Sequence, residues 1–226
     1  GKTTLAGTFP HPFYIDSEEG WMTLRKNPDF NGKVYGVDGI KEVEEFLLSL
    51  RRSLKTPQLL HEFLIKWDWA PDIPIETVVL DSFSFAQEAE KLKVIAELAG
   101  RPNQPAIEEK LGYDGYAVLK VRALLLMRTL KYPPFHVVIT CQSDYKDGVY
   151  HPAIEGGLAK ELGAYFDIIG FMEKVTNLEK GVKKTGHRLW FKHPVHVSGH
   201  RTERLPDYID DPTFEKIFSY LKEEES

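Results

Sequence analysis

The chain has 226 residues, of which 42% are hydrophobic and 28% charged, a balance that suits a single globular domain with a full core. It contains no apolar run of about 18 residues and no signal-peptide pattern, so we expect no membrane-spanning segment. The formal net charge of −5 argues against a broad basic surface for nucleic acid, and the single cysteine, Cys141, excludes an internal disulfide and favours a reducing, cytoplasmic setting.

Strands and helices are predicted to alternate over the first two thirds of the chain. Short apolar runs, two of them ending in an acid, predict buried strands, and apolar residues at helical spacing predict helices. The predicted elements are a helix at 3–8, strands at 12–16 and 33–38, a helix at 40–54, a strand at 76–82, helices at 83–99 and 116–132, and a strand at 135–142. Residues 56–75, which contain two tryptophans and three prolines, are expected to be irregular.

The last third of the chain has a different pattern. Asp147-Gly148 is a strong signal for a hairpin turn, short strands are expected within 165–175 and 187–197, and a closing helix at 212–223. Alternating strands and helices indicate a mostly parallel sheet with helices on both faces, to which this region adds antiparallel strands. We expect one α/β domain over residues 1–226.

The first residues have the pattern of half a phosphate-binding loop. In the motif G-x-x-x-x-G-K-[ST], Gly1, Lys2 and Thr3 would fill the last three positions. Glycine allows close approach of the backbone, lysine reaches the β- and γ-phosphates, and the threonine hydroxyl binds Mg²⁺. Thr4 completes the expected nucleotide-binding group. We therefore expect the front of the loop and the first core strand to precede Gly1.

An acid also stands at the end of a second buried strand. Phosphate-loop NTPases use such an acid to hold the Mg²⁺ shell, and the run TVVLDS places Asp81 there. Asp81 could instead cap the helix that follows, and both roles are compatible.

Three strand endings occur in the order YIDSEEG, VVLDS and VVITCQS, and in this the chain resembles the RecA-like P-loop ATPase core. The resemblance implies that Glu18 activates the attacking water, that Asp81 belongs to the Mg²⁺ shell and that Gln142 senses the γ-phosphate of ATP. Glu19 is the rival of Glu18, since neighbours on a strand face opposite sides. Asp16 would have a supporting role.

The chain more narrowly resembles phage-encoded RecA-like ATPases of the single-strand annealing and recombination type. The segments FPHPFYIDSEEG, YAVLKVRALLLMRTLKYPPFHVVIT and HPAIEGGLAKELGAYFDIIGFM carry this resemblance, which covers nearly the whole chain. It implies a homo-oligomer, either a ring or a filament, that works with phage recombination or replication proteins in the cytoplasm of a bacterial host.

The resemblance further implies a residue that acts on a neighbouring subunit. Ring-forming RecA-like proteins carry a Lys-x-Arg pair on a late strand, and SGHRTERLP has Arg201 at the arginine position but Gly199 at the lysine position. The alternative for Arg201 is a surface ion pair with Glu203 or Asp207.

Two loops would face single-stranded DNA by the same resemblance, one at 100–115 and one at 143–152. Arg101, Tyr113, Tyr145 and Lys146 would then contact phosphates or stack on bases. The alternative is that these are ordinary solvated loops.

Three histidines, His193, His196 and His200, are numerous enough to ligate zinc. A strand would place His193 and His196 on opposite faces, and no cysteine is near, so we expect no metal site there.

Three functions are compatible with these patterns. The first is a Mg²⁺-dependent ATPase that acts on single-stranded DNA in recombination. The second is a P-loop kinase for a small molecule, although no arginine-rich lid is evident. The third is a nucleotide-gated replication or packaging accessory protein with slow turnover.

Overall fold

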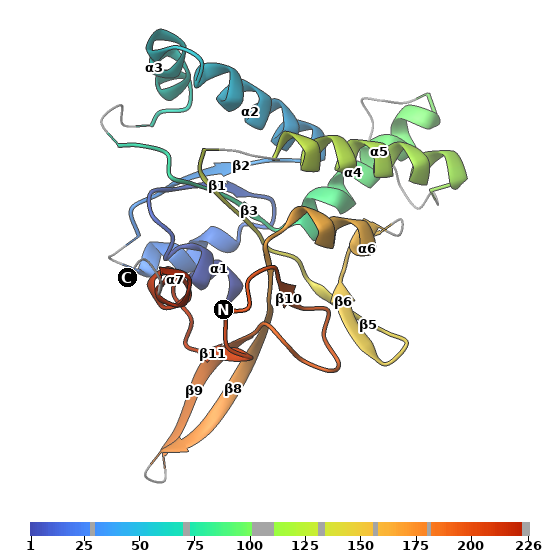
Figure 1. The fold of residues 1–226 in the computed structure, drawn as a ribbon. Helices are drawn as coiled ribbons and strands as arrows, with labels where there is room; N and C mark the ends of the chain where they lie inside the picture. Colours follow the sequence, from blue (N-terminus) through green and yellow to red (C-terminus); the bar gives the residue numbers. More distant parts are fainter. Residues whose placement is uncertain are drawn as a thin grey trace.

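The computed structural model describes residues 1–27, 30–69, 73–100, 111–130, 134–155, 158–179 and 182–222. Its core is a four-stranded parallel sheet with the order β2-β1-β3-β4 (Figure 1). The strands are β1 (Pro12–Asp16), β2 (Lys33–Gly36), β3 (Thr77–Asp81) and β4 (His136–Ile139). All four fall within predicted strands, which confirms the parallel α/β core. Because the strands share one direction, β1 and β3 end together, with Asp16 paired to Asp81.

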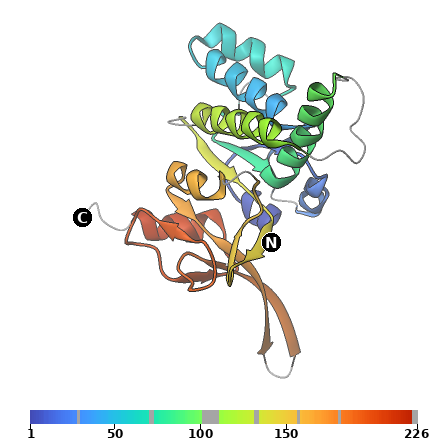
Figure 2. The same cartoon turned by 90° about the vertical axis from the view of Figure 1, so that its right-hand side faces the viewer.

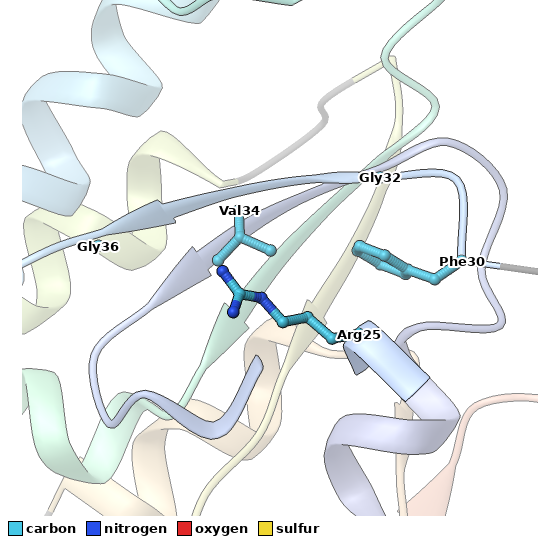
Figure 3. Close-up of a pocket in the computed structure, with 5 residues that line it drawn as sticks. All are labelled: Arg25, Phe30, Gly32, Val34 and Gly36. Carbon is cyan, nitrogen blue, oxygen red and sulfur yellow. The ribbon is translucent and has the colours of Figure 1, made fainter. Parts of the chain in front are cut away.

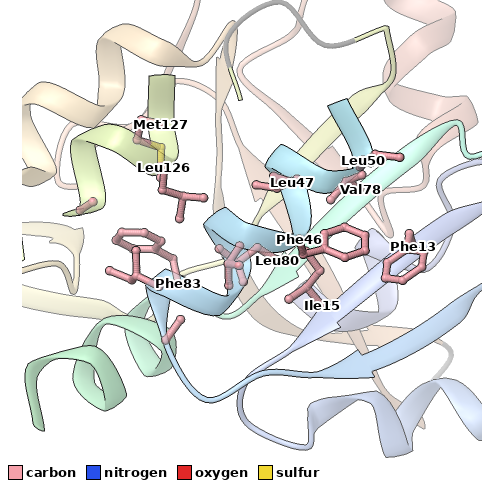
Figure 4. Packing of buried hydrophobic residues seen from close by; sticks show 14 of the residues in the cluster. Phe13, Ile15, Phe46, Leu47, Leu50, Val78, Leu80, Phe83, Leu126 and Met127 are labelled. Carbon is pink, nitrogen blue, oxygen red and sulfur yellow. The ribbon is translucent and has the colours of Figure 1, made fainter. Parts of the chain in front are cut away.

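Helices cover both faces of the sheet, as predicted (Figure 1). One face carries α2 (Ile40–Ser53), α4 (Phe83–Leu98) and α5 (Tyr113–Thr129); the other carries α1 (Lys2–Ala6) and the 3-10 helix η1 (Gly20–Lys26). Strand alternation decides which residue faces which layer. Phe13 and Ile15 of β1 pack with Phe46 of α2 (Figure 4), whereas Tyr14 packs with Leu24 of η1. No helix in the described residues is long and apolar enough to cross a membrane.

The prediction of an irregular segment at 56–75 is wrong, because α3 (Pro57–Lys66) lies within it. Thr56 caps this helix, since its side chain accepts a hydrogen bond from the Leu59 N–H at 3.3 Å. Proline at the first helical position favours a helix start, because it has no N–H to leave unpaired. Trp69 then packs on Phe13 with ring centroids 5.5 Å apart.

Antiparallel strands follow in the last third, as predicted. β5 (Ser143–Lys146) and β6 (Val149–Pro152) form a hairpin whose turn residues, Asp147 and Gly148, have φ values of 54° and 83°. Next come α6 (Leu158–Leu162), the 3-10 helix η2 (Gly163–Tyr165), β7 (Ile168–Ile169), β8 (Phe171–Glu179), β9 (Val182–Trp190), β10 (Gly199–His200), β11 (Tyr208–Asp210) and α7 (Phe214–Lys222). β8, β9 and β11 form a second sheet, and the β8–β9 hairpin projects away from the body (Figure 2).

The strand predicted at 187–197 ends early, at Trp190. The chain then forms a loop that contains Pro194, which has no N–H for a strand ladder. In this loop the rings of His193 and His196 stack, with centroids 4.2 Å apart. The prediction that these two histidines face opposite sides is therefore wrong.

Candidate active site

Asp81 is the centre of a cluster of hydroxyl groups at the carboxyl end of β3. Its side chain is fully buried. The Thr3 hydroxyl donates to Oδ2 at 2.7 Å, the Tyr14 hydroxyl donates to the same oxygen at 3.2 Å, and the Thr140 hydroxyl donates to Oδ1. Burial and the charge of Asp81 raise the pKa of Tyr14, which keeps this hydroxyl protonated as a donor. The buried carboxylate is thus held by three hydroxyl donors, from α1, from β1 and from the residue that follows β4.

Glu18 and Glu19 lie in different surroundings. The Ser82 hydroxyl donates to Glu18 Oε2 at 3.3 Å. A Cβ added at Gly20 would lie 3.6 Å from both Glu18 Oε1 and Thr3 Oγ1, so these two oxygens flank the same small space. Glu19, in contrast, is exposed and has a left-handed φ of 58°. The strand already ends at Asp16, so it is this turn, and not strand alternation, that separates the two glutamates.

The pKa of Glu18 is raised, first by burial and then by the negative charge of Asp81. The Ser82 hydroxyl and the Lys2 ammonium act in the opposite direction. Lys2 therefore lies within electrostatic reach of Glu18, although its own side chain is exposed. A carboxylate with a raised proton affinity beside a cation has the character of a general base.

The remaining predicted residues lie around this centre. Asp16 is buried, and its Oδ1 accepts a hydrogen bond from the Glu18 N–H at 3.4 Å. Thr4 is exposed on α1. Gln142 is exposed at the foot of the β5–β6 hairpin, where its N–H donates to Ser84 Oγ at 3.0 Å. Gln142 thus stands between the end of β4 and the start of the hairpin.

Sequence reasoning missed several hydroxyl residues of this site. Tyr14 and Thr140 lie within predicted strands and were not expected to bind Asp81. Ser17 Oγ accepts from the Ser82 N–H at 3.1 Å and donates to the Ser82 carbonyl at 2.7 Å, which ties the ends of β1 and β3 together. The Asp81–Ser82 peptide bond is cis. The only signal of these contacts in the sequence was that each of three neighbouring strands ends next to a hydroxyl residue.

The family model described as AAA domain matches residues 1–202. The chain belongs to the AAA domain family. This is a family of P-loop ATPases, so ATP binding is the property that membership assigns to the chain, and Gly1, Lys2 and Thr3 lie inside the matched region. No curated protein matches the chain.

Arg201 of the AAA domain has its contacts at η2 and the residue before β7. Its guanidinium donates to Asp167 Oδ1 at 3.2 Å and to the Ala164 carbonyl, and its N–H donates to the Asp167 carbonyl at 2.9 Å. Arg201 therefore forms a surface ion pair, but the predicted partners, Glu203 and Asp207, are wrong: the partner is Asp167.

The residues predicted to face DNA are distributed over two places in the AAA domain. Tyr113 begins α5 and is 90% exposed, while Tyr145 and Lys146 are exposed on β5. Arg101 lies outside the described residues.

A pocket of about 380 Å³ in the AAA domain has none of the hydroxyl cluster among its lining residues (Figure 3). It is lined by Arg25, Phe30, Gly32, Val34 and Gly36, next to the edge strand β2. It therefore does not belong to the candidate active site.

Glu18→Gln is expected to raise the thermal stability of the AAA domain at pH 7–8. The folded state raises the pKa of Glu18, so it favours the protonated side chain. The stability that this group contributes is therefore present below about pH 4.5, and it is lost as the pH rises through the pKa of Glu18 in the folded state. The neutral variant should gain about 1–2 °C in Tm at pH 8, a small shift because solvent screens the group, and nothing near pH 4. Calorimetry across this range is the test; an equal Tm difference at all pH values would contradict it.

Proposed function

We propose that this AAA domain hydrolyses ATP in a Mg²⁺-dependent reaction and couples it to binding of single-stranded DNA in phage-type recombination. The observation that carries the proposal is the contact of Thr3 Oγ1 with Asp81 Oδ2 at 2.7 Å, with Glu18 beside it. A hydroxyl, a buried carboxylate and a second carboxylate, next to an exposed lysine, are the groups that phosphoryl transfer to water needs.

The oxygen donors of the site fit Mg²⁺. Thr3 and Asp81 present a hydroxyl and a carboxylate side by side, and Mg²⁺ prefers oxygen ligands and retains several waters. These two residues would hold the ion, which neutralises phosphate charge when it is bound. Lys2 binds the phosphates from its exposed position, and the Tyr14 and Thr140 hydroxyls keep the Asp81 carboxylate in place.

Glu18 orients the attacking water and accepts its proton. Its raised pKa makes it a better base than an ordinary glutamate, and the Ser82 hydroxyl fixes one of its oxygens. The water oxygen bonds to the γ-phosphorus as its proton moves to Glu18, and the bond between the γ-phosphorus and the bridging oxygen breaks to leave ADP and phosphate. Gln142 passes its contact with the γ-phosphate to the β5–β6 hairpin. The hydrogen bond of 2.8 Å from the Ala153 N–H, which follows β6, to the Gln142 carbonyl supports this coupling.

Two further features belong to the proposal through the resemblance to RecA-like proteins. The protein assembles as a homo-oligomer in the bacterial cytoplasm, and Arg201 leaves Asp167 to reach the nucleotide of a neighbouring subunit. The exposure of Arg201, 60% of its side chain, supports this second role, because a solvated ion pair is broken at little cost.

Lys2→Ala tests the proposal in a chain that carries the complete G-x-x-x-x-G-K-[ST] motif. Phosphate release from ATP is measured with Mg²⁺, in the presence and absence of a 20-nucleotide single strand. We expect the strand to accelerate wild-type turnover, and Lys2→Ala to lower it about 100-fold or more, because the lysine stabilises charge in the transition state.

Lys41→Ala is the control. This lysine is exposed on α2, and its contact with Glu90 is made by the backbone N–H, which alanine retains. Absence of turnover in the wild type would refute the ATPase proposal, and full activity of Lys2→Ala would refute the role given to Lys2. Turnover that ignores the strand would refute the DNA part and favour a kinase, for which transfer of phosphate to a small molecule would be the assay.

A further inference from the structure

The β5–β6 hairpin has two feet, Gln142 before β5 and Ala153 after β6. The feet are joined to each other, because the Ala153 N–H donates to the Gln142 carbonyl at 2.8 Å. The turn of the hairpin points away from α4 (Figures 1 and 2). Gln142 follows Thr140, whose hydroxyl bonds Asp81, by two residues. The feet therefore connect the hairpin to the end of β4 at the candidate active site.

The Ser84 hydroxyl of α4 bonds both feet at once. It accepts a hydrogen bond from the Gln142 N–H at 3.0 Å and donates one to the Ala153 carbonyl at 2.9 Å. A hydroxyl has one proton to donate and lone pairs to accept, so the two bonds exist together. Serine commonly bonds the backbone near it in sequence, but these partners lie 58 and 69 residues further along the chain. The Ser84 side chain thus makes a tertiary contact.

Ser84 extends a series of contacts between the start of α4 and the end of β4. Asp81 accepts from the Thr140 hydroxyl, and the Phe83 N–H donates to the Thr140 carbonyl at 2.8 Å. The bond from the Gln142 N–H to Ser84 Oγ is the third contact in this series. Three hydrogen bonds thus join residues 81–84 to residues 140–142, and they fix the Gln142 backbone relative to the Asp81 carboxylate.

A second anchor for the exit from the hairpin lies further along α4. The Gln87 side chain is buried, and its Oε1 accepts from the Glu155 N–H at 2.8 Å. The Lys91 ammonium bonds Glu155 Oε1 at 2.7 Å. Ser84, Gln87 and Lys91 lie on one face of the helix, since they are three and four residues apart. Of these three side chains, Ser84 is the one that also bonds Gln142.

We propose that Ser84 is a positioning residue for ATP hydrolysis, which acts by holding the Gln142 backbone in place relative to Asp81. The Gln142 side chain is exposed, so the place from which it reaches the γ-phosphate is set by its backbone. A misplacement of about 1 Å lowers a rate by about 100-fold, and a hydroxyl that fixes this backbone therefore matters for the chemical step. This inference rests on the proposed contact of Gln142 with the γ-phosphate and is independent of DNA.

The first test is phosphate release by Ser84→Ala in a chain that carries the complete G-x-x-x-x-G-K-[ST] motif. We expect kcat to fall about 10-fold to 100-fold and KM for ATP to stay within about 3-fold, because the partners of Ser84 belong to the hairpin and not to the phosphate loop. Ser84→Thr, which keeps the hydroxyl, should retain at least about a third of the wild-type kcat.

Ser53→Ala is the matched control, because the Ser53 hydroxyl donates to the Leu50 carbonyl within its own helix, α2; its kcat should stay within about 2-fold. Circular dichroism establishes that each variant folds. We expect Ser84→Ala to fold, since Tyr150 of β6 keeps two backbone hydrogen bonds, of 2.8 and 2.9 Å, to the loop that contains Val195 and Val197.

A double-mutant cycle separates positioning of Gln142 from a general structural role. Gln142→Ala removes the side chain but keeps the backbone N–H that bonds Ser84. If Ser84 acts through the Gln142 side chain, adding Ser84→Ala to Gln142→Ala should lower kcat by less than about 2-fold. An equal loss in both backgrounds would overturn the inference, as would a loss in Ser84→Ala that threonine does not restore.

Failure of the proposed function gives different results. Absence of turnover in the wild type refutes the ATPase itself. Full activity of Gln142→Ala refutes the contact with the γ-phosphate, and the inference fails with it. If Gln142→Ala loses activity while Ser84→Ala keeps it, the role of Gln142 stands and the role given to Ser84 is wrong.

Discussion

Glu18→Gln is expected to lower the rate of ATP hydrolysis about 100-fold to 10,000-fold, the range typical for loss of a general base, while ATP binding stays within a few-fold. Glutamine retains the shape of the side chain and the acceptor for the Ser82 hydroxyl, but it cannot take a proton from water. Single-turnover hydrolysis, together with titration of a fluorescent ATP analogue, separates the chemical step from binding.

Glu19→Gln is the matched control, because it makes the same change one residue further along the chain. Glu19 is exposed and turned away by its left-handed backbone, so we expect wild-type turnover. A loss of activity in Glu19→Gln with normal activity in Glu18→Gln would assign the base to the other glutamate and refute the role given to Glu18.

Arg122→Met should lower the free energy of unfolding by about 3–5 kcal/mol, the typical cost of leaving a buried charge without its partner. Glu90 on α4 is completely buried. Its Oε1 accepts from Arg122 Nη1 at 2.5 Å, and its Oε2 accepts from the Lys41 N–H at the start of α2 at 3.1 Å. The methionine would fill the space of the arginine but supply no donor. Urea denaturation measures the effect.

A second substitution distinguishes the buried charge from simple loss of packing. In the double variant Glu90→Gln/Arg122→Met the charge is gone, so most of the lost stability should return. Lys91→Met is the control: its ammonium is similarly exposed and bonds Glu155 at 2.7 Å, but Glu155 is partly solvated, so we expect about 1 kcal/mol or less. An equal loss in both single variants would contradict the prediction.

Most of the parallel core could be predicted because its signals are local. Short apolar runs marked β1 and β3, and apolar spacing marked α2. The missed helix α3 shows the limit of such signals: Pro57 was counted among three prolines as a sign of irregular structure, although at a first helical position it favours a helix. The early end of β9 was missed because Pro194, which has no N–H for a strand ladder, was not counted against the predicted strand.

The candidate site was predictable only in part for the same reason. The acid at the end of a buried strand pointed to Asp81, and the resemblance to RecA-like ATPases implied Glu18. The two lie at one edge because the ends of parallel strands meet there. The hydroxyls of Tyr14 and Thr140 could not be assigned, because their contact with Asp81 depends on the register between strands that are far apart in sequence. The partner of Arg201 was likewise set by the tertiary packing of Asp167 and not by sequence proximity.

The strand order also determines when the site can form during folding. Each pairing in the parallel sheet joins distant segments, for Tyr14 pairs with Val79 and Val79 with Val138. Folding slows as contacting residues become more distant in sequence, because chain entropy is lost before the contacts form. The Asp81 cluster joins Thr3 to Thr140, so no growing chain can complete it on the ribosome until both have emerged. The site is thus a late product of folding, and its presence reports that β1, β3 and β4 have joined.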